Sequence, residues 1–260
     1  MILEELKEKL TPFIHRGDTI CIFSDITSFG FPPSLKEQIK KNGPIIIMDS
    51  YIDTLKEIVG PTGLIILPTF TYSATKKEIY DPDKTPSTVG ALTEHFRKQN
   101  DVKRSLHPVF SFAAWGNEAE KFLQLENYNC FGEGSIFQKL YDRNATYLLF
   151  GVDMQHGATY IYFSEEKLNV PYRYPKQFTG KIKNNNQETE ITFSYFVRKL
   201  EIPYNDSRDR LQLESLQRNI SHAVTFNGGT IIITESQPIH ALIKEKLALN
   251  PNYLIQKVTA

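Results

Sequence analysis

Three short apolar runs, each followed by a helical pattern, constrain the fold of this chain more than any other feature. They are "TICIFSDI" (19–26), "GLIILPTF" (63–70) and "ATYLLFGV" (145–152). Each run is continuous rather than alternating and contains β-branched residues, which is typical of strands buried on both faces. Because such strands alternate with helices along the chain, the sequence predicts an α/β fold with helices on both sides of a central sheet.

The last third of the chain carries two hairpin signals. The segment "GKIKNNNQETEITFSYFV" (180–197) alternates around an Asn-rich turn, and "AVTFNGGTIIITES" (223–236) has Asn-Gly-Gly as its turn. We find no repeat and no low-complexity linker. The sequence therefore predicts one domain over 1–260. It is expected to be a three-layer α/β/α fold with a mixed, largely parallel central sheet, and its C-terminal part (181–260) should add hairpins and a closing helix.

Cap residues predict where two of the helices begin. The segment "MDSYIDTLKEIVG" has Asp49 or Ser50 as a candidate N-cap and ends on a glycine. The segment "TPSTVGALTEHFRKQN" has Thr85 or Ser87 as a candidate N-cap. We therefore expect one helix to start near residue 49 and the other near residue 86.

Composition excludes several classes of protein. Lys plus Arg equals Asp plus Glu at 30 each, so the formal net charge is zero and the basic excess of a nucleic-acid binder is missing. No apolar run is long enough to cross a bilayer, and the first residues predict an amphipathic helix rather than a signal peptide. Cys21 and Cys130 make neither a disulfide framework nor a zinc spacing. We expect a cytoplasmic protein without metal, membrane or nucleic-acid partner.

Polar side chains gather where the predicted strands end, which is where open α/β sheets bind their ligands. Hydroxyl groups at such positions often serve only as helix caps or in turns, and that interpretation stays open for each one. A whole rim of them beside a glycine is better explained by a polar ligand such as a phosphate or a pantetheine chain. The rim comprises Ser24, Asp25, Thr27, Ser28, Thr69, Asp153, His156 and Thr159.

Common catalytic motifs are absent, but two histidines and one helix face remain as candidates. There is no GxGxxG, Walker or GxSxG motif. His107 lies in "RSLHPVFS", and His156 lies at a strand-to-helix junction. Thr159, Tyr162 and Glu165 share one face of the next predicted helix, so a carboxylate could bond the tyrosine hydroxyl. An ordinary amphipathic helix with solvated glutamates is the alternative.

Four segments resemble the antibiotic N-acetyltransferase family, that is, the aminoglycoside 3-N-acetyltransferases and their relatives. The resemblance implies an α/β fold that binds acetyl-CoA as co-substrate and acetylates an amine of an amino sugar, as in antibiotic resistance. It covers "GDTICIFSDITSFG" (17–30), "GLIILPTFTYS" (63–73), "TPSTVGALTEHFRKQNDVKRSLHPVFSFAAWGNEAE" (85–120) and "GVDMQHGATYIYFSEEKLNVPYRYPKQFTG" (151–180).

The resemblance also assigns expected roles to individual positions. The pantetheine is expected along the loop formed by Ser24, Asp25, Ile26, Thr27 and Ser28. The family's Arg-Ser-x-His-Pro block is matched here, and its members are expected to line the cleft, the first two beside the cofactor. They are Arg104, Ser105 and His107.

The family's catalytic helix reads Thr-x-x-His-x-x-Glu, and this chain departs from it at the central position. Thr159 and Glu165 match, but Tyr162 stands where the family has its histidine base. A phenol with an ordinary pKa near 10 is a poor base, whereas it can donate a hydrogen bond. Asp25 and Phe23 are further departures, since relatives usually have a small hydroxyl residue and often a histidine there.

Three hypotheses follow. The first is a working CoA-dependent N-acyltransferase in which the amine attacks the thioester directly in a ternary complex. His156, Glu165 or His107 would then take the proton, and Tyr162 would polarise a carbonyl or thiolate. The second is an inactive scaffold that binds a sugar, a nucleotide-sugar or a partner. The third is an enzyme of the same fold that uses a different acyl donor or performs a different transfer. An amino sugar of a surface glycan is an alternative acceptor. A homodimer is left open.

Overall fold

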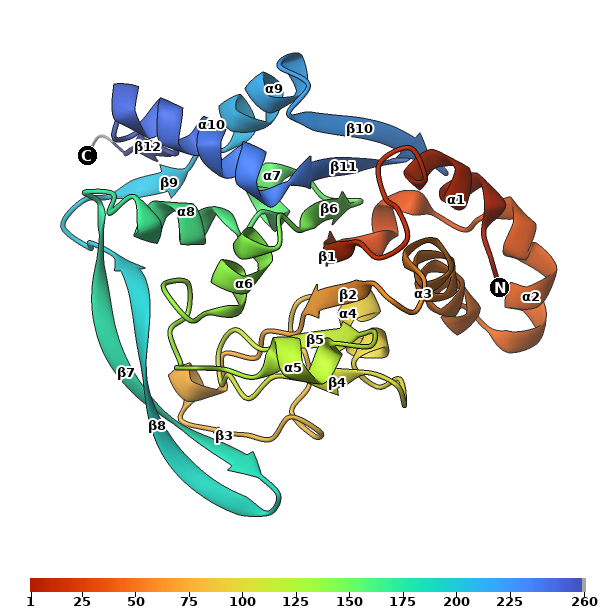
Figure 1. Cartoon of the computed structure of the whole chain (residues 1–260), viewed down its shortest axis with the longest axis horizontal. Helices are drawn as coiled ribbons and strands as arrows, with labels where there is room; N and C mark the ends of the chain where they lie inside the picture. The colour runs from red at the N-terminus through yellow and green to blue at the C-terminus, as the bar shows by residue number, and fades with distance from the viewer. Residues whose placement is uncertain (259–260) are drawn as a thin grey trace.

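The central element is a seven-stranded sheet with the order β10-β11-β6-β1-β2-β5-β4 (Figure 1). The computed structural model describes residues 1–258. The three apolar runs form the middle of this sheet, as predicted. The strands are β1 (Thr19–Ser24), β2 (Leu64–Pro68), β4 (Lys103–Arg104), β5 (Phe112–Trp115), β6 (Thr146–Phe150), β10 (Ser221–Phe226) and β11 (Gly229–Glu235).

The sheet is mixed, as expected, with its parallel pairing confined to the centre. β1 pairs in parallel with β2 and with β6. β11 and β5, on either side of this core, run antiparallel to β6 and β2. The sheet therefore contains fewer parallel strand pairs than the largely parallel sheet that the sequence predicted. The second predicted hairpin joins the sheet as β10 and β11, and strands joined by a two-residue turn can pair only antiparallel.

Helices cover both faces of the sheet, which confirms the three-layer arrangement. Side chains alternate along β1: Ile20 and Ile22 belong to the core on one face, and Cys21 and Phe23 to the core on the other. The first face packs against α1 (Glu4–Leu10), α3 (Ile45–Val59) and α4 (Ala91–Phe96). The second packs against α5 (Ala119–Leu123), α6 (Ile136–Asp142), α8 (Ile161–Lys167) and α10 (Ser236–Leu249).

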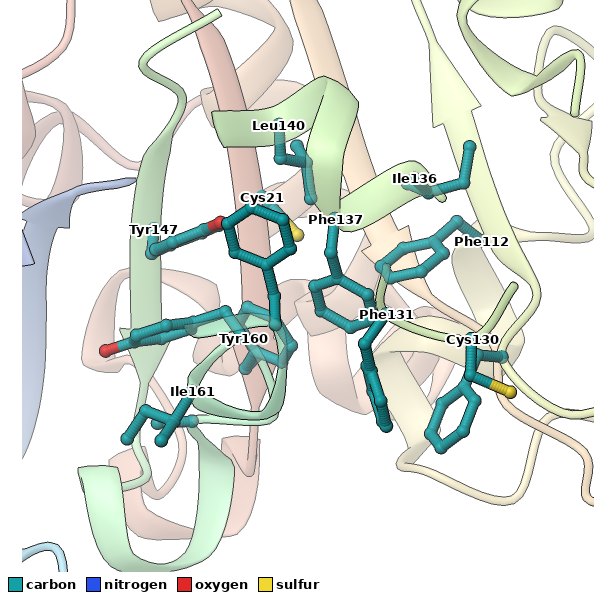
Figure 2. Packing of buried hydrophobic residues seen from close by; sticks show 14 of the residues in the cluster. Cys21, Phe112, Cys130, Phe131, Ile136, Phe137, Leu140, Tyr147, Tyr160 and Ile161 are labelled. Carbon is teal, nitrogen blue, oxygen red and sulfur yellow. The ribbon is translucent and has the colours of Figure 1, made fainter. Parts of the chain in front are cut away.

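The core on the second face is rich in aromatic side chains. Figure 2 shows Phe112, Phe131 and Phe137 close to one another and Tyr147 beside Tyr160, whose rings stack with their centroids 4.2 Å apart. The two cysteines are free and buried in this core, so no disulfide links them.

A long two-stranded arm extends from the main body (Figure 1). Its strands, β7 (Arg173–Asn184) and β8 (Gln187–Arg198), confirm the first predicted hairpin, which begins at Arg173 and is longer than expected. Asn185 and Asn186 both have positive φ, the backbone signature of a tight hairpin turn. β3 (Ile79–Tyr80) adds to β7, and β9 (Tyr204–Asp206) pairs with β12 (Ile255–Lys257).

Two helices begin away from their predicted caps. α3 begins at Ile45, directly after Pro44, so Asp49 and Ser50 lie inside it. α4 begins at Ala91 because the preceding residues have tertiary partners: Thr88, for instance, donates from its amide (2.9 Å) and its hydroxyl (3.0 Å) to the carbonyl of Phe70.

The remaining helices are short. They are α2 (Lys36–Asn42), α7 (Met154–Gly157), α9 (Asp209–Gln217) and the 3-10 turns η1 (Ile26–Phe29), η2 (Pro33–Leu35) and η3 (Ser73–Lys76). Over residues 1–258, no helix combines the length and apolar character needed to cross a membrane.

Gly151, at the end of β6, lets the loop after β1 pack directly on the sheet. Its φ is +78°, and a Cβ at this position would overlap the carbonyl oxygen of Asp25 and the hydroxyl of Ser28. Only glycine satisfies both the backbone conformation and the close approach. The position of the loop over residues 25–28 therefore depends on this glycine.

We expect Gly151→Ala to destabilise the protein more than Gly43→Ala. Gly43 has nearly the same φ of +77°, but a Cβ there would meet no other atom within 4 Å. Alanine at position 43 would therefore introduce backbone strain without any steric overlap. That strain should cost roughly 1–3 kcal/mol in either variant, and the overlap at Gly151 should add about 1–3 kcal/mol. Urea unfolding of both variants measures the difference. Equal losses would show that the loop does not depend on contact with Gly151.

Candidate active site

A cleft of about 760 Å³ opens where the central parallel strands end, as the sequence predicted. Its walls come from the loops after β1, β2 and β6, the start of α4, the helices α7 and α8, and single residues of β8 and β9. The lining residues used below are Ser24, Asp25, Ile26, Thr27, Gln155, His156, Thr159, Tyr162, Asp206 and Arg208.

The loop after β1 is held in shape by its own polar groups. The carboxylate of Asp25 accepts hydrogen bonds from the amide (3.1 Å) and the hydroxyl (2.6 Å) of Thr27 and so caps η1. Ser28 donates to the carbonyl of Asp25 and is not part of the cleft wall. The buried hydroxyl of Ser24 has no hydrogen-bond partner among the described residues, which leaves it available to a ligand.

Tyr162, on α8, is enclosed by charged side chains. Its hydroxyl donates to the carboxylate of Asp206 at 2.9 Å. The guanidiniums of Arg173 and Arg208 lie over its ring, 4.4 and 4.6 Å from the centroid. Burial raises the pKa of Tyr162 above its ordinary value, although Arg208 opposes the shift. The phenol is therefore protonated at neutral pH and acts as a hydrogen-bond donor.

Glu165, one turn further along α8, does not bond Tyr162. It is 1% exposed, and its carboxylate accepts from the hydroxyl of Tyr172 at 2.8 Å and pairs with Nε of Arg173 at 2.7 Å. Burial raises the pKa of Glu165, and Arg173 opposes that shift. The carboxylate that the sequence paired with Tyr162 thus serves Tyr172 and Arg173, and Asp206 takes its place.

Asp206 is the meeting point of three guanidiniums. Its carboxylate lies 3.3 Å from Arg208, 3.6 Å from Arg173 and 3.8 Å from Arg198. Two further contacts fix this segment to α7, because the amide of Gln155 donates to the carbonyl of Asp206 and accepts from the backbone N–H of Arg208, both at 2.8 Å. The paired charges satisfy the requirement that buried ions have partners.

His156 lies on α7 at the wall of the same cleft. Its Nδ1 is 2.7 Å from the carboxylate of Asp153, the residue that also caps α7 by accepting from the backbone N–H of His156. A carboxylate at Nδ1 favours the tautomer with its proton there, which leaves Nε2 as the free acceptor. Thr159 also lines the cleft, so the structure brings together His156, Thr159 and Tyr162.

The expectation that the Arg-Ser-x-His-Pro block lines this cleft needs correction. Arg104 donates to the carbonyls of Thr69, Pro82 and Thr85 and so ties a loop to the end of β2. The hydroxyl of Ser105 accepts from the amide of Phe112. Both side chains border a separate hollow of about 820 Å³. Their polar groups are used to hold the backbone.

His107 is buried, and both of its ring nitrogens have backbone partners. Nδ1 accepts from the amides of Val109 and Phe110 at 3.1 and 3.0 Å, and Nε2 donates to the carbonyl of Tyr128 at 3.2 Å. Burial lowers the pKa of His107 to about 4. Its place in the structure is that of a neutral ring that fixes the turn before β5.

Sequence reasoning missed several residues of the site. Asp206 and Arg208 lie more than forty positions beyond Tyr162, Arg173 lies at the start of the arm, and Gln155 was passed over beside His156. None of them belongs to the Thr-x-x-His-x-x-Glu pattern or to the Arg-Ser-x-His-Pro block. The only available signal is the charged residue Arg173 within the aromatic segment "PYRYP", because a charge among aromatic residues indicates a buried ion pair.

The chain is similar in sequence and in fold to known proteins. A family model described as aminoglycoside 3-N-acetyltransferase matches residues 38–248. The SPbeta prophage-derived aminoglycoside N(3')-acetyltransferase-like protein YokD of Bacillus subtilis (strain 168) is 28% identical over 179 residues, and this match spans 62% of each chain. The aligned part is therefore less than two thirds of that relative's length.

Two solved structures have the same fold. AAC-IIIb, described as a binary complex with CoASH, has a TM-score of 0.78 at 18% identity, covering 96% of this chain and 97% of its own. AAC(3)-IVa, as a histidine-to-alanine mutant in complex with apramycin, has a TM-score of 0.74 at 21% identity, covering 96% and 93%.

The buried imidazole of His107 should make the protein sensitive to mild acid. Its pKa in the folded state, about 4, lies below the ordinary value near 6.5, so the unfolded chain takes up the proton first as the pH falls. The stability present above pH 6.5 should therefore decrease by about 3 kcal/mol between pH 6.5 and 4 through this group.

The measurement compares the free energy of unfolding of the wild type and His107→Asn at both ends of this pH range. Asparagine retains an acceptor for the amides of Val109 and Phe110 but does not titrate. We expect the variant to lose about 3 kcal/mol less than the wild type on acidification. Parallel losses would contradict the assigned role of His107.

Proposed function

Since the chain belongs to the aminoglycoside 3-N-acetyltransferase family, we propose that it is a CoA-dependent N-acyltransferase. It would transfer the acetyl group of acetyl-CoA to an amine of an amino sugar or an aminoglycoside-like acceptor. One observation carries this proposal: a single cleft holds both the polar loop after β1 and the α7–α8 segment with His156, Thr159 and Tyr162.

The loop after β1 would hold the pantetheine part of the cofactor. Ser24, Asp25, Ile26 and Thr27 contribute to the cleft wall, and the free hydroxyl of Ser24 can bond an amide of the ligand. Asp25 uses its carboxylate to cap η1, which explains a charged residue in this position. A relative with this fold is described as a complex with CoASH, which supports the assignment of the cofactor.

The reaction would be a direct transfer without a covalent enzyme intermediate. The amine nitrogen attacks the thioester carbon, the new C–N bond replaces the C–S bond, and the thiolate of CoA leaves. Cys21 and Cys130 are buried, and burial raises the pKa of both thiols, so neither suits the role of a nucleophile.

His156 is the base that the geometry favours among the three candidates. Its Nε2 is free, and Asp153 orients the ring. Glu165 is enclosed by Tyr172 and Arg173, and His107 lies away from the cleft with both nitrogens occupied. His156 would take the proton of the attacking amine and pass it to the departing thiolate.

Tyr162 would donate a hydrogen bond to the departing thiolate or to the thioester oxygen. Its hydroxyl now donates to Asp206, a carboxylate that keeps its guanidinium neighbours when the hydroxyl turns to the substrate. The second candidate function is a protein that binds a sugar or a nucleotide-sugar without catalysing a transfer. It is favoured because Tyr162, a protonated phenol, occupies the position where the family has its base.

Thiol release from acetyl-CoA in the presence of amine acceptors tests the proposal together with His156→Gln. We expect this variant to lose about 100-fold or more in kcat, because general base catalysis contributes at least that much. His95→Gln is the matched control, since His95 pairs with Asp49 at 2.6 Å outside the cleft wall. Its rate should stay near that of the wild type.

Calorimetry with CoA separates the two candidate functions. Binding of CoA with no thiol release from any amine would favour the scaffold. If CoA fails to bind at all, the acyltransferase assignment is lost. Full activity of His156→Gln would show that His156 is not the base, whereas the proposed class of reaction would still hold.

Tyr162→His, which restores the family's residue, should not raise turnover. The guanidiniums of Arg173 and Arg208 lie 4.4 and 4.6 Å from the ring centre and would oppose the protonation of an imidazole there. Initial rates of thiol release across neutral pH measure this. A clear increase in rate would mean that Tyr162 had merely replaced a general base and that His156 does not serve as one.

A further inference from the structure

A cluster of charged side chains adjoins the wall of the cleft, to which it contributes Asp206 and Arg208. Three guanidiniums, of Arg173, Arg198 and Arg208, surround two carboxylates, those of Glu165 and Asp206. Arg173 and Arg208 are each only 5% exposed at the side chain, whereas Arg198 is 46% exposed. Each buried guanidinium has a carboxylate partner, so the cluster holds Arg208 in a fixed position.

The cleft wall carries two acidic residues, which differ in their surroundings. Within residues 1–258, the carboxylates that line the cleft are those of Asp25 and Asp206. The first is bonded to the amide and hydroxyl of Thr27, and the second to Tyr162 and the guanidiniums. An ammonium group that leaves water needs a carboxylate or several acceptors in exchange. The charge of Asp206 is thus shared with cations, whereas Asp25 is bonded only to neutral groups of Thr27 through one oxygen.

Arg208 is the cation that faces the cleft. It lines the wall and is 4% exposed as a residue, and its backbone is clamped by Gln155. Its guanidinium makes only long contacts with the described residues, 3.4 Å to the carbonyl of Ala158 and 3.3 Å to Asp206. A guanidinium has five N–H donors in a planar fork, so donors remain for a ligand. Carboxylate and phosphate groups match that fork.

We propose, resting on the acyltransferase function above, that the amine acceptor carries an anionic group and that Arg208 binds this group. The acceptor is then an amino sugar with a carboxylate or a phosphate rather than a polycationic aminoglycoside that carries no anion. The amine and the anion of such an acceptor occupy the same cleft, with the amine toward His156 and the anion toward Arg208.

Binding of matched probes to the CoA-saturated protein tests the proposal by calorimetry. Glucosamine, glucosamine 6-phosphate and muramic acid share one amino sugar and differ in having no anion, a phosphate or a carboxylate. Tobramycin represents the polyamines. We expect both anionic probes to bind about tenfold tighter than glucosamine, as a charge-assisted bond to a fixed cation allows, and tighter than tobramycin. The difference between the two anionic probes identifies which anion fits.

Three variants assign the effect to Arg208. In Arg208→Gln the anionic probes should bind no tighter than glucosamine, whereas Arg208→Lys should retain part of the preference because it keeps the charge. Arg210→Gln is the control, since Arg210 is exposed on α9 and donates to the carbonyl of Tyr253. It should preserve the full preference. If Arg208→Gln does not fold, inorganic phosphate added to the wild type must compete with the anionic probes and leave the affinity for glucosamine unchanged.

Tobramycin binding as tightly as the anionic probes, or an unchanged preference in folded Arg208→Gln, overturns the proposal. The proposal is also overturned if Arg208→Gln loses affinity only for a dicarboxylic acyl donor such as succinyl-CoA, because Arg208 would then bind the acyl group and not the acceptor. The acyltransferase function is judged separately from CoA binding and thiol release. If the protein prefers the anionic probes but does not bind CoA, Arg208 is retained as an anion-binding residue and the proposed acyl transfer is rejected.

Discussion

The ion pairs around Asp206 are the constraint on which the site depends. This carboxylate joins α8 through Tyr162, the arm through Arg173 and Arg198, and the segment after β9 through Arg208. Removing one member of such a buried pair typically costs about 3–5 kcal/mol, because an uncompensated charge remains. The arm and the cleft therefore form one structural unit: the cleft wall is complete only when residues 173–208 are docked on α8.

The same ion pairs explain why a tyrosine is compatible with the position where the family has a histidine. Two guanidiniums over one ring disfavour a third positive charge, and an imidazole that accepts a proton would become such a charge. A neutral phenol gains from the cations and still donates to Asp206. Because the position cannot readily hold a base, the base that we propose is His156, whose ring is oriented by Asp153.

Local patterns predicted the parts of the structure that depend on local physics. The apolar runs became the central strands, and the Asn-rich and Asn-Gly-Gly turns became hairpins. The loop over residues 24–27 lies at the cleft because strand ends meet at one edge of a sheet. Long-range pairing stayed out of reach: β9 is three residues long, and nothing near Asp206 in the sequence indicates its partners. Arg104 and His107 were placed at the cleft because their motif suggested it, whereas their hydrogen bonds hold the backbone.

The cleft is built before any ligand arrives, and this determines how it can select one. Asp25 fixes the loop after β1, Gly151 sets its distance from the sheet, and Gln155 holds the backbone of Arg208. Groups fixed in this way lose little conformational entropy on binding, so they favour a ligand that matches them as they stand. The guanidinium of Arg208 is one such fixed group, and a ligand that brings an anion to it need not displace the backbone around it. The proposed preference for an anionic acceptor therefore depends on the position of Arg208 as much as on its charge.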